Sequence, residues 1–309
     1  MRFHKALTVL LLLALAAPLR AQEVLGRNLE SWTFTERVGR GDWFQFSTRM
    51  GDVTVTEGSG DRVEIRAEKL LRGGRASDIG FVVLRHRDGL TVCAVYEEDE
   101  CEEDGIRSDS RSNWSRGRRA SLEVTIRVPR GVKIHAGSGN GEVSVTGADN
   151  EVIAASGNGR VRVEGAGARV KASSGNGAVS VAGARGPVEA SSGNGNVTVA
   201  TSLGPVSASS GNGTLDIRMD ELRDSERMEF STGNGRIRLT VPSNFAAEID
   251  ANTGNGDIVS DFPITITGRL SKTRIRGTIN GGGSRVRLTS GNGQIELRSG
   301  SSRERRESR

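Results

Sequence analysis

The sequence is poor in large side chains. Among its 309 residues there are one Tyr, three Trp and eight Phe, against 42 Gly. Such a chain cannot build a bulky globular core, yet its valines recur too regularly for a disordered polypeptide. We therefore expect a narrow interior lined by small aliphatic side chains.

Long hydrophobic runs are also scarce. The apolar stretch Ala6–Ala17 follows Arg2 and Lys5 and leads to Leu19-Arg20-Ala21, a pattern that predicts a secretory signal peptide over residues 1–21. The stretch is too short to cross a bilayer, and no later one approaches the roughly 20 apolar residues required. We expect an exported protein, in the periplasm, on the cell surface or secreted, with no transmembrane segment after cleavage.

An excess of charge is missing as well. Removal of Arg2, Lys5 and Arg20 with the leader lowers the formal net charge from +5 to +2. Two net charges supply little counterion release on binding a polyanion. We therefore expect no nucleic-acid partner.

Cysteine occurs only twice, as Cys93 and Cys101. Because an exported protein meets oxidising conditions, we predict that the two form a disulfide. The alternative is a redox-active pair. A disulfide would remove both residues as metal ligands.

The most frequent motif is Gly-Asn-Gly, which follows Ser or Thr at eight places. Its asparagines are Asn140, Asn158, Asn176, Asn194, Asn212, Asn234, Asn255 and Asn292. The first five lie 18 residues apart, and a fixed period of this length is typical of stacked repeat architectures.

Aligned at this period, the repeats show columns of like residues. Val143, Val161, Val179 and Val197 share one column, a second valine column lies two places later, and Val152, Val170, Val188 and Val206 form a third. The residues between them are polar or variable, an alternation that predicts strands rather than helices. Asn-Gly also favours hairpins, but an antiparallel meander requires no match between residues 18 apart. The columns favour an all-β, single-chain parallel β-solenoid with coils of about 18 residues and Gly-Asn-Gly turns.

The motif itself has a structural interpretation. Glycine and asparagine tolerate positive φ angles, Ser or Thr can satisfy a backbone group of the turn, and asparagines stacked about 4.8 Å apart can form an amide ladder. A calcium-binding role would need a regularly placed Asp, which the repeats lack.

No residues suggest catalysis, a cofactor or a metal. His86 and His135 stand alone, and the outward carboxylates differ in column from repeat to repeat. The arginines are more suggestive, because four strands each carry two on one outward face: Arg160 and Arg162, Arg236 and Arg238, Arg274 and Arg276, and Arg285 and Arg287. Stacking could align some of them into a basic ridge that binds phosphate or carboxylate groups; the alternative is a solvated face that merely blunts sheet edges.

The chain divides into a signal peptide (1–21), N-terminal strands or cap (22–49), a β-solenoid (50–298) and a disordered tail (299–309). Trp32–Phe46 is the predicted N-terminal cap. An inserted segment, 97–119, has an acidic and then a basic half and is predicted to be a solvated loop, with a docking loop around Trp114 as the alternative. Met219–Met228, where the spacing widens, could form a helical turn.

Several of these motifs resemble the bacterial putative adhesin domain family of exported β-solenoids. They are Trp43-Phe44-Gln45-Phe46, Val128-Pro129-Arg130-Gly131-Val132, Val241-Pro242, and the closing segment from Gly282 to Ile295, which resembles the family's last coil. The resemblance implies an adhesive role and offers no catalytic residue. The resulting hypothesis is a non-catalytic adhesin or cell-envelope scaffold that binds anionic cell-surface polysaccharide or another envelope protein. The alternative is a polysaccharide lyase or hydrolase on a β-helix.

Overall fold

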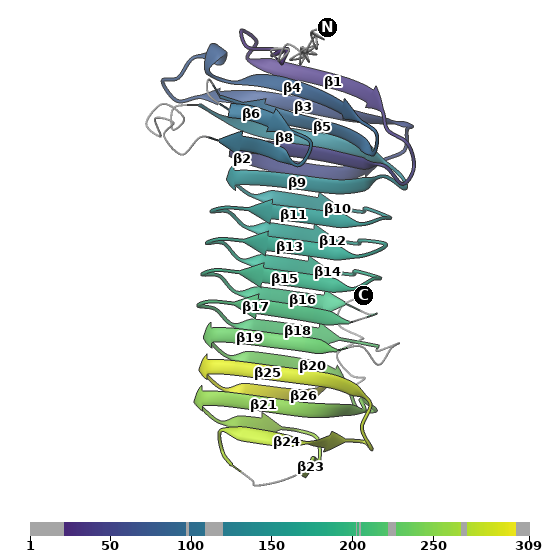
Figure 1. Cartoon of the computed structure of the whole chain (residues 1–309), viewed down its shortest axis with the longest axis vertical. Coiled ribbons are helices and arrows are strands. Elements are labelled where there is room, and N and C mark those ends of the chain that lie inside the picture. The colour runs from purple at the N-terminus through teal and green to yellow at the C-terminus, as the bar shows by residue number, and fades with distance from the viewer. Residues whose placement is uncertain are drawn as a thin grey trace, which may run out of the picture.

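The computed structural model describes residues 22–96, 99–108, 120–201, 203, 205–221, 227–266 and 271–300. They form an elongated parallel β-solenoid, which confirms the predicted fold class (Figure 1). Each coil contributes one strand to each of two facing sheets, termed here sheet A and sheet B.

The regular middle of the rod follows the 18-residue period. Its sheet A strands are β9 (Lys133–Asn140), β11 (Val152–Ser156), β13 (Val170–Ser174), β15 (Val188–Ser192) and β17 (Val206–Ser210). Its sheet B strands are β10 (Val143–Thr146), β12 (Val161–Glu164), β14 (Val179–Ala182), β16 (Val197–Thr201) and β18 (Leu215–Met219). Successive strands pair in parallel, so that Val143 lies beside Val161 and Val161 beside Val179.

The columns of small aliphatic residues fill the space between the sheets. Val161 and Val163 of sheet B and Val170 and Ala172 of sheet A are each no more than 1% exposed. Larger side chains enter near the two ends, with Phe44 and Phe46 towards one and Phe230 towards the other. Burial of these stacked side chains is the main stabilising contribution.

The glycines of the Gly-Asn-Gly turns are required by close approach of neighbouring coils. A Cβ on Gly159 would lie 1.8 Å from the carbonyl oxygen of Gly141, and one on Gly177 would lie 2.0 Å from that of Gly159. Neither glycine has a positive φ, and among the described non-glycine residues only Asn280 does. Of the motif glycines, only Gly256 and Gly293 have a positive φ, at 158° and 159°, and no motif asparagine does. Left-handed backbone therefore does not explain the motif in most coils: the turns lie so directly on one another that a side chain does not fit.

The polar residues of the motif join one coil to the next. In the regular stack, Asn158 donates to Asn140 at 2.7 Å, and the same side-chain hydrogen bond is repeated along the corner. The buried serine or threonine before each motif bonds to the neighbouring coil: Ser174, for example, accepts from the Gly177 amide at 2.8 Å and donates to the Gly159 carbonyl at 2.7 Å.

At the C-terminal end, the coils do not stack in chain order. The strands are β19 (Met228–Asn234), β20 (Ile237–Pro242), β21 (Ala247–Asn255), β22 (Ile258–Ser260), β25 (Ser284–Asn292) and β26 (Ile295–Gly300). β25 lies between β19 and β21 (Figure 1). On the other sheet, β26 pairs with β20 on one side and β22 on the other. The amide ladder follows this order, because Asn292 donates to Asn234 and Asn255 donates to Asn292.

This order corrects the expectation that the segment Gly282–Ile295 forms the last coil. This segment is the last coil in the sequence, but in space it lies between two earlier coils. Its core residues and its corner asparagine are of the same kind as those of both neighbouring coils, so it can pair with either. We refer to residues 284–300 as the inserted coil.

The N-terminal end shows a related displacement. β2 (Trp43–Gly58) forms one whole coil, which lies between β9 and β10 on one side and β5 (Gly89–Val95) and β8 (Ala120–Pro129) on the other. The predicted boundary between residues 49 and 50 thus falls inside a continuous strand. Phe44 and Phe46 belong to this internal coil, whereas Trp32 lies in the cap and stacks on Phe81 at 4.1 Å between ring centroids.

Antiparallel strands cover both ends of the stack. At the N-terminal end these are β1 (Ser31–Arg37), β3 (Arg62–Leu71) and β4 (Gly80–His86), with the short 3-10 helix η1 (Ala76–Asp78). Lys69 fastens this cap, because its buried Nζ donates to the carbonyls of Gly26, Arg27, Ala76 and Ile79. At the other end, β24 (Arg274–Ile279) pairs with β21 and with β23 (Thr265–Ile266).

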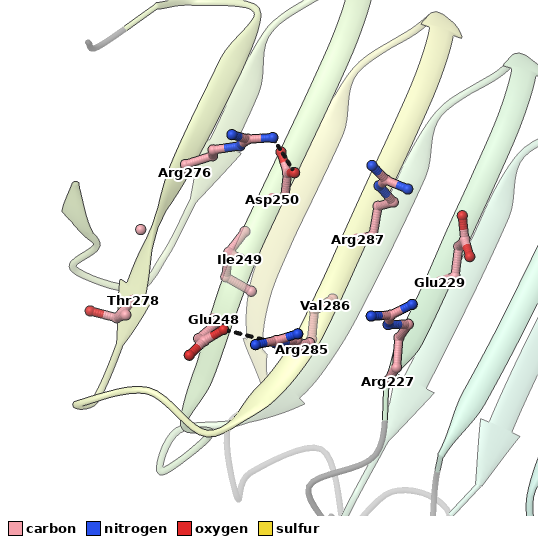
Figure 2. Close-up of a pocket in the computed structure, with 11 residues that line it drawn as sticks. Arg227, Glu229, Glu248, Ile249, Asp250, Arg276, Thr278, Arg285, Val286 and Arg287 are labelled. Atoms are coloured by element: carbon pink, nitrogen blue, oxygen red, sulfur yellow. Dashed lines mark hydrogen bonds and ion pairs between the residues drawn. The ribbon is translucent and has the colours of Figure 1, made fainter. Parts of the chain in front are cut away.

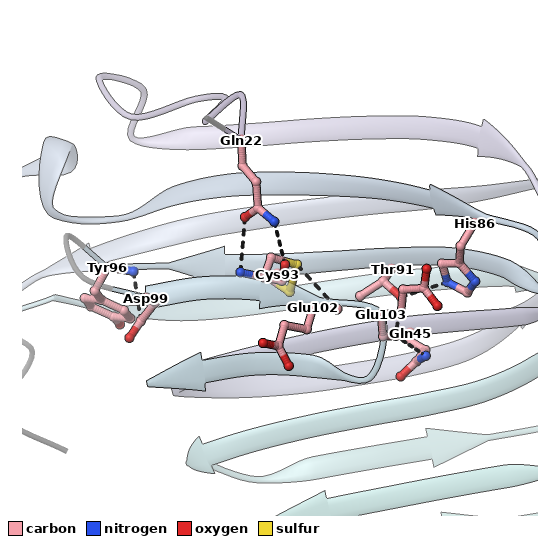
Figure 3. Close-up of a disulfide and its surroundings, with 10 residues drawn as sticks. Gln22, Gln45, His86, Thr91, Cys93, Tyr96, Asp99, Glu102 and Glu103 are labelled. Atoms are coloured by element: carbon pink, nitrogen blue, oxygen red, sulfur yellow. Dashed lines mark hydrogen bonds between the residues drawn. A yellow bond between two sulfur atoms is a disulfide. The ribbon is translucent and has the colours of Figure 1, made fainter. Parts of the chain in front are cut away.

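The described part of the charged insertion is a hairpin rather than a loop. β6 (Asp99–Glu102) pairs with β7 (Gly105–Ser108), and the predicted disulfide between Cys93 and Cys101 is confirmed, which ties the hairpin to β5 (Figure 3). The Glu103 carbonyl accepts hydrogen bonds from Gln45 and Thr91. Charged side chains, exposed or partly exposed, flank Cys101 on β6, and Cys101 itself is buried against Val82 and Val95. This burial explains why a segment rich in charge folds here.

Some predictions lie outside the described residues. These are the signal peptide, the second half of the charged insertion with Trp114, and the tail from residue 301. Ser299 and Gly300, assigned to that tail, are instead the end of β26. Of the predicted helical turn, Met219 ends β18 and Met228 begins β19, while residues 222–226 are not described.

The serine bridge can be tested at Ser174. We expect Ser174→Ala to lower the free energy of unfolding by about 1–3 kcal/mol, because two hydrogen bonds, to the partly buried Gly159 carbonyl and from the partly buried Gly177 amide, are lost. The measurement is urea unfolding. Ser173→Ala is the matched control, since its side chain lies on the outer face, and should change stability by less than about 0.5 kcal/mol. Equal effects of the two substitutions would contradict the bridge.

Candidate functional site: an arginine-lined groove

The eight arginines proposed as a ridge lie on two different faces. Arg160, Arg162, Arg236 and Arg238 belong to coils of sheet B, whereas Arg274, Arg276, Arg285 and Arg287 belong to sheet A. The sequence could not distinguish the faces, because outward positions of both sheets carry the same alternation. A single basic ridge is therefore not formed.

On sheet B, the predicted arginines are engaged by carboxylates. Arg162 pairs with Glu164 at 2.6 Å, and Arg160 lies 3.9 Å from Glu142. Arg236 and Arg238 both contact Glu296, at 3.2 and 3.3 Å, together with Arg298 at 3.1 Å. These contacts make this part of the face an ion-pair network rather than an open cationic surface.

Glu296 is the centre of that network and belongs to the inserted coil. Its residue exposure is only 4%, because the three guanidinium groups cover it. Burial opposes ionisation of this carboxyl, but the hydrogen bonds and positive charges of Arg238 and Arg298 outweigh that effect and lower its pKa. The carboxylate thus holds β26 to β20 electrostatically.

On sheet A, three of the predicted arginines line a groove of about 500 Å³ at the C-terminal end. The groove crosses four adjacent strands, β19, β25, β21 and β24 (Figure 2). Its charged lining comprises Arg227, Glu229, Glu248, Asp250, Arg276, Arg285 and Arg287. Arg274 lies at the start of β24 opposite Asn252 and is not part of the lining.

Charges alternate across the groove. One row runs Glu229, Arg287, Asp250 and Arg276 across the four strands. Asp250 pairs with Arg276 at 3.0 Å, and in the adjacent row Glu248 pairs with Arg285 at 3.2 Å (Figure 2). In the described part of the chain, Arg227 and Arg287 make no ion pair and remain available to an anion.

Part of this lining could not be predicted from the sequence. Arg227 and Glu229 belong to the coil of β19, and the displaced coil order brings that coil beside Arg285 and Arg287. A search for like residues at a fixed spacing cannot find such a site, because the site depends on unlike residues in coils that are not consecutive.

The histidines do not form a further site. His135 contacts Gln45 at 2.6 Å and His86 contacts Thr91 at 3.0 Å, both beneath the β6–β7 hairpin. Burial lowers the pKa of His135, with a smaller opposing effect from Asp104. No group of three or more His, Cys, Asp or Glu side chains suited to a metal ion occurs in the described ranges.

One protein-family model matches this chain. The family model for Toastrack DUF4097 matches residues 99–298, about two thirds of the chain and most of the stacked coils. The chain belongs to the Toastrack DUF4097 family. No curated protein matches it. No helix among the described residues is long and apolar enough to cross a membrane.

Two solved structures are similar to this Toastrack chain. One is described as a "putative adhesin" from Bacteroides fragilis NCTC 9343, with 14% identity, a TM-score of 0.42, and coverage of 88% of this chain and 98% of that one. The other is described as a "putative cell adhesion protein" from Clostridium sporogenes ATCC 15579, with 11% identity, a TM-score of 0.26, and coverage of 87% and 100%.

The Glu296 network predicts a defined pH dependence. The pKa of Glu296 is lower in the folded than in the unfolded state, so its contribution is complete above the ordinary glutamate pKa of about 4.3 and is lost as pH falls through the lowered value. Glu296→Gln should reduce stability at pH 7 by about 1.5–3 kcal/mol and should remove this part of the acid destabilisation.

The measurement is urea unfolding of both proteins between pH 7 and pH 3. Glu142→Gln, which removes an exposed partner 3.9 Å from Arg160, is the control and should cost less than about 1 kcal/mol. A stability difference between wild type and Glu296→Gln that does not change over this pH range would contradict the assignment.

Proposed function

We propose that this Toastrack protein is an exported, non-catalytic envelope scaffold or adhesin that holds acidic polysaccharide in the arginine-lined groove. The observation that carries the proposal is that Arg227 and Arg287, two of the four arginines that line the groove, form no ion pair among the described residues. Guanidinium groups bind carboxylate or sulfate through paired, directional hydrogen bonds.

The mixed charge of the groove fits a sugar acid better than a simple anion. Arg227 and Arg287 can donate to the acidic groups of the polymer, while Glu229, which has no ion pair among the described residues, can accept from its hydroxyl groups. The strands that carry these side chains are fixed by pairing within the sheet, so the backbone of the site needs little ordering when a ligand binds.

The carboxylates of the groove bear on the alternative function, a carbohydrate-active enzyme. Glu229, Glu248 and Asp250 all line this groove. Two of the three already form ion pairs with arginines, at 3.2 and 3.0 Å, so only Glu229 is without such a partner among the described residues. We therefore favour binding without cleavage.

The binding proposal can be tested with polygalacturonate as an acidic probe and dextran as a neutral one. Wild-type protein should bind polygalacturonate in a salt-dependent manner and should not bind dextran. Arg227→Ser/Arg287→Ser should weaken binding at least about tenfold, because two charged contacts of at least 1.4 kcal/mol in total are lost. Isothermal titration calorimetry at low ionic strength is the measurement.

Arg160→Ser/Arg162→Ser is the matched control, since it removes the same charge from exposed ion pairs on sheet B. Binding by this variant should stay within about twofold of wild type. Equal weakening by both double variants would show that only net charge matters, and release of cleaved product from polygalacturonate would favour the enzyme.

A further inference from the structure

The inserted coil occupies a slot between two coils that precede it in the chain. One wall of the slot is β19 and β20, and the other is β21 and β22. Val286, Leu288, Ile295 and Leu297 fill it, each no more than 2% exposed. Parallel backbone pairing, core packing and the amide ladder join the coil to both walls, and the Glu296 network joins it to the wall of β19 and β20. None of these contacts depends on how the coil is joined to the rest of the chain.

The two walls match each other as well as they match the inserted coil. Met228 and Ile249 both pair with Val286, and Asn234 and Asn255 both pair with Asn292. Removal of the inserted coil would therefore leave two surfaces already in register. The slot is a site that accepts one coil of this pattern, from whichever chain supplies it.

A short glycine-rich segment connects the inserted coil to the preceding strand. Residues 280–283, Asn-Gly-Gly-Gly, join β24 to β25, which lie on opposite sides of β21. All four residues have positive φ, from +49° at Asn280 to +157° at Gly283. Glycine allows this crossing over β21, and it equally allows the segment to extend and release the coil.

We propose that the slot is an interface for a second copy of this chain, whose own inserted coil enters in trans. The contacts within the slot are the same in cis and in trans, so that only the hinge conformation and the loss of freedom on association distinguish the two states. A short linker gives the inserted coil an effective concentration on the order of millimolar at the slot of its own chain. Exchange between chains therefore requires protein concentrations that approach this range, or a change in residues 280–283 that prevents the coil from reaching its own slot.

The exchanged state would build the groove from two chains. Arg285 and Arg287 belong to the inserted coil, whereas Arg227, Glu229, Glu248, Asp250 and Arg276 belong to the walls of the slot and to β24. Each groove would then mark a junction between copies, and a dimer would present two grooves to a polymeric ligand. The exchange itself does not rest on the proposed function, because it concerns the slot and not the ligand.

Single cysteines on the two sides of the slot report exchange directly. Ser231 of β19 lies opposite Thr289 of β25 on the outer face. Ser231→Cys and Thr289→Cys proteins, prepared separately and with the native disulfide intact, are mixed, unfolded in urea, refolded together at high concentration and then oxidised. We expect a disulfide-linked heterodimer with twice the monomer mass, identified by mass spectrometry.

Two controls define the geometry. The double variant Ser231→Cys/Thr289→Cys should form the same disulfide within one chain after dilute refolding. A mixture of Ser191→Cys and Thr289→Cys should give no heterodimer, because β17 and β19 separate Ser191 from β25. If the double variant crosslinks internally while the Ser231→Cys and Thr289→Cys mixture yields no more heterodimer than this control, the proposal is wrong.

A hinge variant gives a second measurement that needs no added cysteine. Deletion of Gly281 and Gly282 leaves too little chain to cross β21 comfortably and should shift the protein from monomer to dimer or larger closed species by light scattering. A shortened protein that remains monomeric, with its thermal unfolding unchanged, would also overturn the proposal. Neither readout involves polysaccharide, so its outcome is independent of the binding test.

Discussion

The spacing of about 4.8 Å between parallel strands is the constraint on which the rest of this structure depends. Because each coil is fixed on the next by backbone pairing, every side chain meets its equivalent one coil away. In the regular middle of the rod, valines therefore stack on valines in the core, asparagines reach one another along a corner, and serines bridge adjacent turns. The same spacing excludes a Cβ at the turns, where carbonyl oxygens of the coil below lie about 2 Å from its position.

This constraint determines what could be predicted from the sequence. Val143, Val161 and Val179 revealed the strands, their inward faces and their register, because stacking repeats like residues at a fixed period. The order of the outer coils could not be predicted, since Asn234, Asn255 and Asn292 carry the same motif and any of them fits beside any other. The physical reason for the glycines was also missed, because a contact between backbones of different coils leaves the same sequence signal as a strained turn. Unlike residues that meet once, such as Arg287 and Glu229, leave no periodic signal at all.

Departures from the 18-residue repeat are concentrated towards the two ends of the rod, and the disulfide, the Glu296 network and the groove lie there too. Antiparallel strands cover one end and β24 covers the other, while the disulfide-linked hairpin packs on the outer face of sheet A near the N-terminal end. The inserted coil brings Glu296 among three arginines on sheet B and brings Arg285 and Arg287 into the groove on sheet A. The regular middle of the rod thus holds the two ends apart and in fixed orientation. The displaced coil at one end creates a surface that repetition alone would not provide.

The order of the coils can be measured through the asparagine ladder itself. In a sample labelled selectively at asparagine side-chain amides, nuclear Overhauser contacts should join Asn292 to both Asn234 and Asn255, because Asn292 donates to the first and accepts from the second. Individual Asn→Ser substitutions would assign the signals. Contacts that join Asn292 to both neighbours, with none between Asn234 and Asn255, are the result predicted here. A direct contact between Asn234 and Asn255, with Asn292 beyond them, would mean that the coils stack in chain order and would contradict the account.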